Sequence, residues 1–144
     1  MELIGLHLIS HKSVIYKDTL RHYLCYRQNQ HDMNTSGIRP HFLMVNLKRK
    51  IYIPTSQIIM LEGSGNYTIV HLRYQRKQLY AKCISVFEEM LLPEGFIRVH
   101  RGFIVNPQYV IKYDSIRCII SLRHNLEATV SRRKKEEISS LFCD

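Results

Sequence analysis

The chain has 144 residues, enough for one domain with its own core, and 45% of them are hydrophobic, which excludes a disordered chain. No apolar run approaches the roughly 18 residues that span a bilayer, so we expect no membrane segment. The net charge is +9, and residues 42–144 hold 16 basic against 9 acidic side chains, a net charge of +7. A basic domain attracts nucleic acid or an anionic membrane through its long-range field, although many basic proteins bind neither.

The first 41 residues read as an extension followed by a linker. We expect a strand at 3–9 and a helix at 13–26. Residues 28–40 are polar and rich in Asn, Asp, Ser, Gly and Pro, a composition typical of a linker. The predicted domains are therefore 1–41 and 42–144. No basic region precedes the apolar start and no small-residue cleavage site follows it, so we expect no signal peptide and a cytoplasmic location.

Strand signals dominate the next forty residues. Apolar and alternating segments predict strands at 42–47, 50–53, 58–61, 67–73 and 78–82. The first two flank Lys48 and Arg49, which indicates a hairpin with a basic turn. Glycines and an asparagine at 63–66 predict a second turn.

A short helix is predicted from Ser85 to about Pro93. Ser85 and Glu88 have the spacing of a capping box. The apolar residues that share one face of this helix are Phe87, Met90 and Leu91.

The rest of the chain predicts more short strands and a final helix. The strands are expected at 109–113, 116–122 and 126–130, and the helix from Ser131 to near Phe142. Long alternations of strand and helix are absent, which disfavours a doubly wound parallel sheet. The expected fold is mostly β, with small antiparallel sheets and short helices.

Residues 96–106 read Phe-Ile-Arg-Val-His-Arg-Gly-Phe-Ile-Val-Asn. Arg98, His100 and Arg101 lie between two apolar runs, and buried charge is costly unless it is paired. We expect a corner that apolar residues anchor and whose basic tip faces outward, toward an anion. His100 is interpreted as an ordinary packed or surface histidine rather than a catalyst, and Asn106, before a proline, as a turn former.

Two further polar sites have alternative interpretations. Ser131 is a good N-cap, and the cations that follow it are Arg132, Arg133, Lys134 and Lys135. They form either a solvated charge run or, with the helix N-terminus, a phosphate site. Asn66 and Tyr67 either serve the turn and pack, or contact base edges and phosphate.

Signatures of enzymes and metal sites are absent from the sequence. There is no Walker loop, Gly-x-Ser-x-Gly, His-Glu-x-x-His or paired-carboxylate motif, so we expect neither catalysis nor a cofactor. The four cysteines form no Cys-x-x-Cys pair and are read as reduced thiols. The irregular spacing of His22, Cys25 and His31 makes them poor metal ligands, and no metal is expected.

Three blocks in the chain carry a family resemblance. They are residues 53–67 (Ile-Pro-Thr-Ser-Gln-Ile-Ile-Met-Leu-Glu-Gly-Ser-Gly-Asn-Tyr), 96–106 and 128–133 (Ala-Thr-Val-Ser-Arg-Arg). In this order and at these separations, residues 42–142 resemble the LytTR-type DNA-binding domain of bacterial response regulators and transcription factors.

The resemblance implies an elongated arrangement of small antiparallel sheets whose edge loops enter successive major grooves of paired promoter repeats. The implied partner is double-stranded promoter DNA, bound by a sequence-specific transcriptional regulator. The implied contact residues are Asn66 or Tyr67, Arg101, and Arg132 or Arg133, with Arg98 and Lys134 as phosphate partners. Arg101 would either read a guanine or hold a phosphate.

Two departures from the family pattern stand out. Gly102 occupies a position where the family usually has serine, which we expect to loosen the tip. Family members commonly follow a phosphorylated receiver domain, and the 41 residues that precede this domain are too few for one. We therefore expect a regulator without a receiver domain in this chain.

Two other functions stay open at this point. One is a nuclease or RNA-processing enzyme that uses His71 or His100 beside arginines. The other is a module whose β edges bind a protein. A homodimer, paired copies on DNA and a regulatory protein partner are also open, as are the operator and the input signal.

Overall fold

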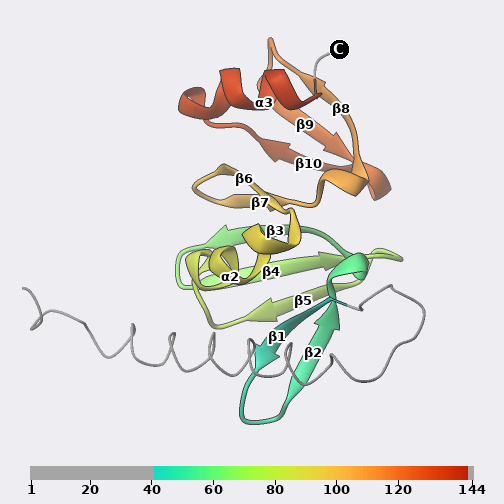
Figure 1. The fold of residues 1–144 in the computed structure, drawn as a ribbon, viewed down its shortest axis with the longest axis vertical. Helices are drawn as coiled ribbons and strands as arrows, with labels where there is room; N and C mark the ends of the chain where they lie inside the picture. The colour runs from blue at the N-terminus through green and yellow to red at the C-terminus, as the bar shows by residue number, and fades with distance from the viewer. Residues whose placement is uncertain (1–40, 143–144) are drawn as a thin grey trace, which may run out of the picture. The chain divides into compact units, whose positions relative to one another are not determined.

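The computed structural model of the protein describes residues 41–142 (Figure 1). The predicted strand at 3–9, helix at 13–26 and linker at 28–40 lie outside the described residues, as do His22, Cys25 and His31. None of the described helices is long and apolar enough to cross a membrane. By its contacts the chain divides into two compact units, and residues 44–52 belong to a different unit from residues 41–43 and 53–144.

The described chain is mostly β, in several small antiparallel sheets, which confirms the predicted fold class. The strands are β1 (Phe42–Asn46), β2 (Ile51–Pro54), β3 (Ile58–Ser64), β4 (Tyr67–Leu72), β5 (Lys77–Tyr80), β6 (Ile97–His100), β7 (Phe103–Val105), β8 (Val110–Asp114), β9 (Ile119–Leu122) and β10 (Leu126–Thr129). The helices are α2 (Ile84–Leu91) and α3 (Lys135–Phe142), with 3-10 turns η2 (Thr55–Gln57), η3 (Leu92–Glu94), η4 (Pro107–Tyr109), η5 (Arg123–Asn125) and η6 (Arg132–Lys134).

The predicted first hairpin is confirmed. Strands β1 and β2 form a two-stranded sheet, and the basic turn lies between them. The side chain of Asn46 accepts a hydrogen bond from the backbone N–H of Arg49 at 3.0 Å, which closes the turn.

A five-stranded antiparallel sheet has the order β5-β4-β3-β7-β6. Helix α2 lies across one face of this sheet (Figure 1). The side chain of Ile84 lies close to Gly63 of β3. The predicted apolar face of α2 is confirmed, because Phe87, Met90 and Leu91 are all buried.

The predicted capping box at Ser85 was wrong. Helix α2 begins one residue earlier, at Ile84, with Cys83 at the N-cap position and no side-chain cap. Glu88 instead pairs with Arg98, because β6 brings a guanidinium beside this part of the helix. The predicted end of the helix is confirmed: Gly95, at φ +86°, stops η3 in a left-handed conformation that suits glycine.

A second antiparallel sheet has the order β10-β9-β8. The core that joins it to the larger sheet is made of side chains from β3, β6, β7, η4, β9, α3, and β10 with the residue that follows it. Its buried members are Ile59, Met60, Val99, Val105, Tyr109, Ile120, Leu122, Ala128, Val130 and Ile138. Figure 1 shows the β6–β7 hairpin between β3 and β10, and this core therefore packs around the predicted corner.

Two predicted boundaries were wrong for local reasons. Strand β3 continues through Gly63 to Ser64, so the turn is only two residues long, and Gly65 rather than Asn66 takes the positive φ of +59°. Strand β9 begins at Ile119, not at 116, because Asp114 holds a turn. Its carboxylate accepts backbone hydrogen bonds from Ile116 and Arg117 at 3.0 and 2.9 Å.

Candidate nucleic-acid interface

Three turns lie on one side of the two joined sheets, at the left in Figure 1: the β3–β4 turn, the β6–β7 turn and η6 after β10. Backbone hydrogen bonds connect them. The N–H of Gly63 donates to the carbonyl of Gly102 at 2.8 Å, and the N–H of Ser131 donates to the carbonyl of Val99 at 2.9 Å. The three sequence blocks of the family resemblance are thus brought together at one edge.

The β3–β4 turn presents Asn66 and Tyr67 to solvent. Ser64 and Tyr67 form the last pair of the ladder, so both side chains stand at the end of the hairpin. The side chain of Tyr67 is 51% exposed, which argues against a purely packing role. Asn66 does not take a positive φ, so the backbone of the turn does not depend on an asparagine at this position.

The β6–β7 turn presents Arg101. The hairpin register slips between Arg98 and His100, and such a bulge changes the direction in which the following side chains point. Arg101 is exposed at the tip, while Val99 and Val105 are buried in the core below it. The predicted outward-facing basic corner is therefore confirmed at Arg101.

Arg98 does not share that exposure. Its side chain is only 13% exposed, and each guanidinium nitrogen has a protein partner. Nε donates to the carbonyl of His100 at 2.7 Å, Nη2 donates to the carbonyl of Arg101, and Nη1 pairs with the carboxylate of Glu88. The guanidinium therefore connects α2 to the backbone of the turn.

His100 completes the turn. Its Nδ1 accepts a hydrogen bond from the backbone N–H of Gly102 at 3.1 Å, and its ring lies 5.9 Å from that of Phe103. This matches the interpretation of His100 as a packed histidine. A Cβ added at Gly102 would lie 3.6 Å from its nearest neighbours, an ordinary contact, so the usual serine would also fit.

The third turn carries a cluster of cations. Arg132 and Arg133 are exposed, and Lys134 is partly exposed, with its Nζ 3.8 Å from Glu137. Ser131 occupies the predicted N-cap position, but its side chain makes no capping hydrogen bond. The 3-10 turn is thus an exposed positive cluster at the start of a helix, where the backbone N–H groups also favour anions.

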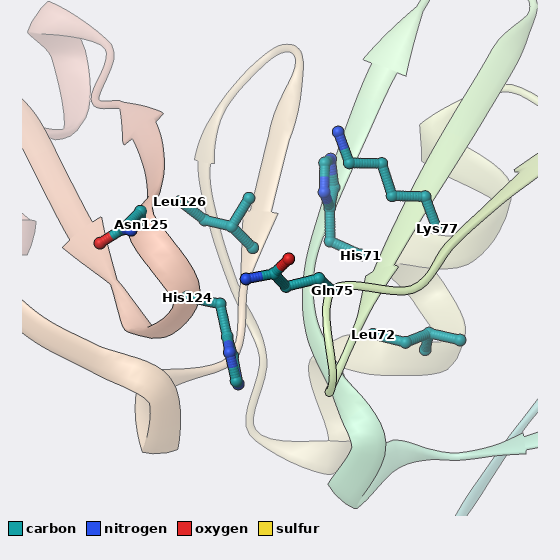
Figure 2. Close-up of a pocket in the computed structure, with 7 residues that line it drawn as sticks. All are labelled: His71, Leu72, Gln75, Lys77, His124, Asn125 and Leu126. Carbon is teal, nitrogen blue, oxygen red and sulfur yellow. The ribbon is translucent and has the colours of Figure 1, made fainter.

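A pocket of about 350 Å³ lies between the end of β4 and the start of β10, away from the three turns (Figure 2). Its lining residues are His71, Leu72, Gln75, Lys77, His124, Asn125 and Leu126. His71 is buried and its Nε2 lies 3.0 Å from a carboxylate oxygen of Glu62, which gives this ring nitrogen a partner within the protein. Within residues 41–142, no three His, Cys, Asp or Glu side chains are grouped as a metal would require.

Two features of the structure, one beside the β6–β7 turn and one at the far ends of the strands, were not predicted from the sequence. Glu88 was assigned to a helix cap, because its spacing from Ser85 gave no sign of its partner on β6. The pocket combines residues that lie about 50 positions apart in the chain, and no local pattern connects His71 with His124.

Comparisons with known proteins agree with the fold. Among solved structures, the chain is similar to the LytTr DNA-binding domain of a protein described as a methyl-accepting/DNA response regulator from Bacillus cereus. The identity is 23%, the TM-score is 0.57, and the match covers 72% of this chain and 97% of the other. No curated protein matches the chain. The family model of the LytTr DNA-binding domain matches residues 48–142, well over half of the sequence, and the chain therefore belongs to the LytTr DNA-binding domain family.

Proposed function

We propose that this protein is a cytoplasmic transcriptional regulator that reads repeats in double-stranded promoter DNA through its three edge turns. The observation that carries the proposal is the convergence of those turns, tied together by the Gly63–Gly102 and Ser131–Val99 hydrogen bonds. Each turn offers an exposed polar side chain of a type that contacts DNA. The role is one of binding, and catalysis has no part in it.

We assign contacts with DNA bases to the β3–β4 and β6–β7 turns. Arg101 stands at the tip of the β6–β7 turn, and an exposed arginine matches the O6 and N7 acceptors of guanine with two hydrogen bonds. Asn66 can pair in the same way with the N6 and N7 atoms of adenine, and the hydroxyl of Tyr67 can reach a phosphate.

We assign contacts with the DNA phosphates to the third turn. Arg132, Arg133 and Lys134 hold phosphates beside the start of the helix, where cations and backbone N–H groups act on the same anion. Such contacts fix the position of the domain on the duplex and carry little sequence information. Two copies on repeated sites would double the contacts that discriminate one promoter from another.

Selection of bound sites from random double-stranded DNA tests the proposal. We expect recovery of two spaced repeats that share a short motif, with affinity that falls as salt rises. The selected duplex is then titrated with Arg101→Ala and with Arg132→Ala, and both variants are expected to bind more weakly. Unchanged affinity in both variants, or selection that enriches no motif, would overturn the proposal.

A further inference from the structure

The guanidinium of Arg98 holds two consecutive carbonyls of the β6–β7 turn. One of them belongs to Arg101 itself and the other to His100. A planar guanidinium with several fixed donors suits this task, because its hydrogen bonds restrain two peptide units at once. The side chain is mostly buried, which leaves little of it to meet a DNA phosphate.

Other hydrogen bonds restrain the turn on its far side. His100 Nδ1 accepts from the N–H of Gly102, and the carbonyl of Gly102 accepts from the N–H of Gly63. The backbone on both sides of Arg101 is therefore held, while its side chain stays exposed. A binding loop restrained in this way loses less conformational entropy when it meets its target.

Glu88 is the anchor of this arrangement. It extends from α2 and pairs with Nη1 of Arg98, so the position of the guanidinium depends on the helix. Charge-assisted hydrogen bonds of this kind are the stronger ones, and they fix orientation. Without Glu88, the mostly buried guanidinium would lose its balancing charge and turn toward solvent or another acceptor.

We infer that Arg98 and Glu88 are positioning residues for DNA binding, which act by holding the turn that presents Arg101. Arg98 then contributes through the backbone of the turn and not as a phosphate partner, which was its predicted role. The inference rests on the proposed function, because it assigns a cause to the base contact of Arg101.

Glu88→Gln distinguishes a positioning role from a general electrostatic effect, because the two predict opposite changes in DNA affinity. Removal of an acidic charge from a DNA-binding domain should strengthen its attraction to DNA. Glutamine keeps an acceptor for Nη1 of Arg98 but not the charge, so the weakened anchor should instead reduce binding to the selected duplex by about 10-fold, with little change on a scrambled duplex of the same composition. The salt slope should stay at the parent value, because no phosphate contact is lost.

Glu89→Gln is the matched control. It makes the same charge change at the next position of α2, where the side chain is exposed. It should bind the selected duplex as tightly as the parent or slightly more so. Equal behaviour of Glu88→Gln and Glu89→Gln would overturn the inference.

Arg98→Lys gives a second variant in case the first perturbs folding, which circular dichroism would report. Lysine keeps the charge that a phosphate partner needs but cannot reach both carbonyls and Glu88. Loss of specific binding in Arg98→Lys supports positioning, and retained binding contradicts it.

A double-mutant cycle provides a readout that a merely structural role would not move. In the Arg101→Ala background, Glu88→Gln should cause no further loss of specific binding, because the residue that it positions is gone. Additive losses would contradict the inference. If Arg101→Ala and Arg132→Ala both leave binding intact, the proposed function itself fails, and that result is visible without any Glu88 variant.

Discussion

The β6–β7 turn and the η6 turn both present arginines at the same edge, but the protein builds them differently. The first is held by Arg98, His100 and the N–H of Gly63. The second has no side-chain cap, and its arginines stand exposed at the start of α3. Exposed positive charge in the two turns therefore comes with different side-chain support of the turn backbone.

Because of this difference, charge alone does not decide which turn contacts bases and which contacts phosphates. A base contact requires an arginine placed within hydrogen-bond distance of particular acceptors, so the backbone below it must be fixed. A phosphate contact tolerates a mobile cation, since the backbone charge repeats along the duplex. The restrained turn thus suits sequence reading, and the exposed cluster suits affinity.

The largest expected effect concerns how the η6 cluster is positioned. The cluster is followed directly by α3, and Ile138 is the residue of this helix that is fully buried in the core. Ile138→Ala should lower the free energy of unfolding by about 2–5 kcal/mol, through lost burial and the cavity left behind. Denaturant titration measures this.

Leu141→Ala is the control on the same helix, because Leu141 is largely exposed. It should change stability by no more than about 0.5 kcal/mol. Equal losses in the two variants would mean that α3 is not anchored through Ile138.

The next effect concerns the support of the β6–β7 turn. A Cβ on Gly63 would lie 2.9 Å from Cγ2 of Ile84, closer than atoms can pack. Gly63→Ala should therefore cost roughly 1–3 kcal/mol of stability, because β3 or α2 must shift. Gly102→Ala has room for its Cβ and should change stability by about 0.5 kcal/mol or less. Thermal or denaturant unfolding compares the two, and an equally small loss in both would refute the close packing.

A smaller effect separates the two turns on DNA. If Arg132 and Arg133 hold phosphates, each alanine variant should make the slope of log affinity against log salt shallower by about 1. The loss should be equal on the selected and the scrambled duplex. A loss confined to the selected duplex would place base reading in the η6 turn and remove the contrast.

The smallest effect comes from the β8–β9 turn, a reference turn with no proposed DNA contact. The backbone N–H of Arg117 holds the pKa of Asp114 below its usual value, helped by the N–H of Ile116 and by the charges of Arg117 and Lys112. Because the pKa of Asp114 is lower in the folded protein, the ionised carboxylate stabilises the fold at pH values above the unfolded pKa of 3.8. This stabilisation is lost as the pH falls through the folded pKa.

The stability difference between the parent and Asp114→Asn should therefore be small at neutral pH and vanish below the pKa of the folded state. Denaturant midpoints at neutral and acidic pH check this. A difference that grows in acid would contradict the assigned sign, and altered DNA affinity would show that this turn is no neutral reference.

Much of the fold could be predicted from local patterns. The hairpin at Phe42–Asn46 and Ile51–Pro54 follows from apolar runs that flank a turn, and the buried face of α2 follows from helical spacing. The boundaries at Gly63 and Ile119 could not, since each depends on a hydrogen bond to a backbone or carboxylate that the pattern does not encode.

The exposed members of the candidate site could also be predicted, because Arg101, Arg132 and Arg133 are unusual residues beside apolar runs and a helix start. The part that supports them could not. Glu88 and Arg98 are ten positions apart on different elements, so their pairing follows only from the packing of α2 beside β6. Sequence patterns find the residues that face outward more readily than those that hold them.

The most direct test is the ratio of affinities for the selected and scrambled duplexes, measured for the parent, Arg101→Ala and Arg132→Ala at one salt concentration. We predict that Arg101→Ala lowers this ratio by roughly 10-fold or more, and that Arg132→Ala lowers both affinities and leaves the ratio unchanged. A ratio that Arg101→Ala does not change would contradict base reading by the β6–β7 turn.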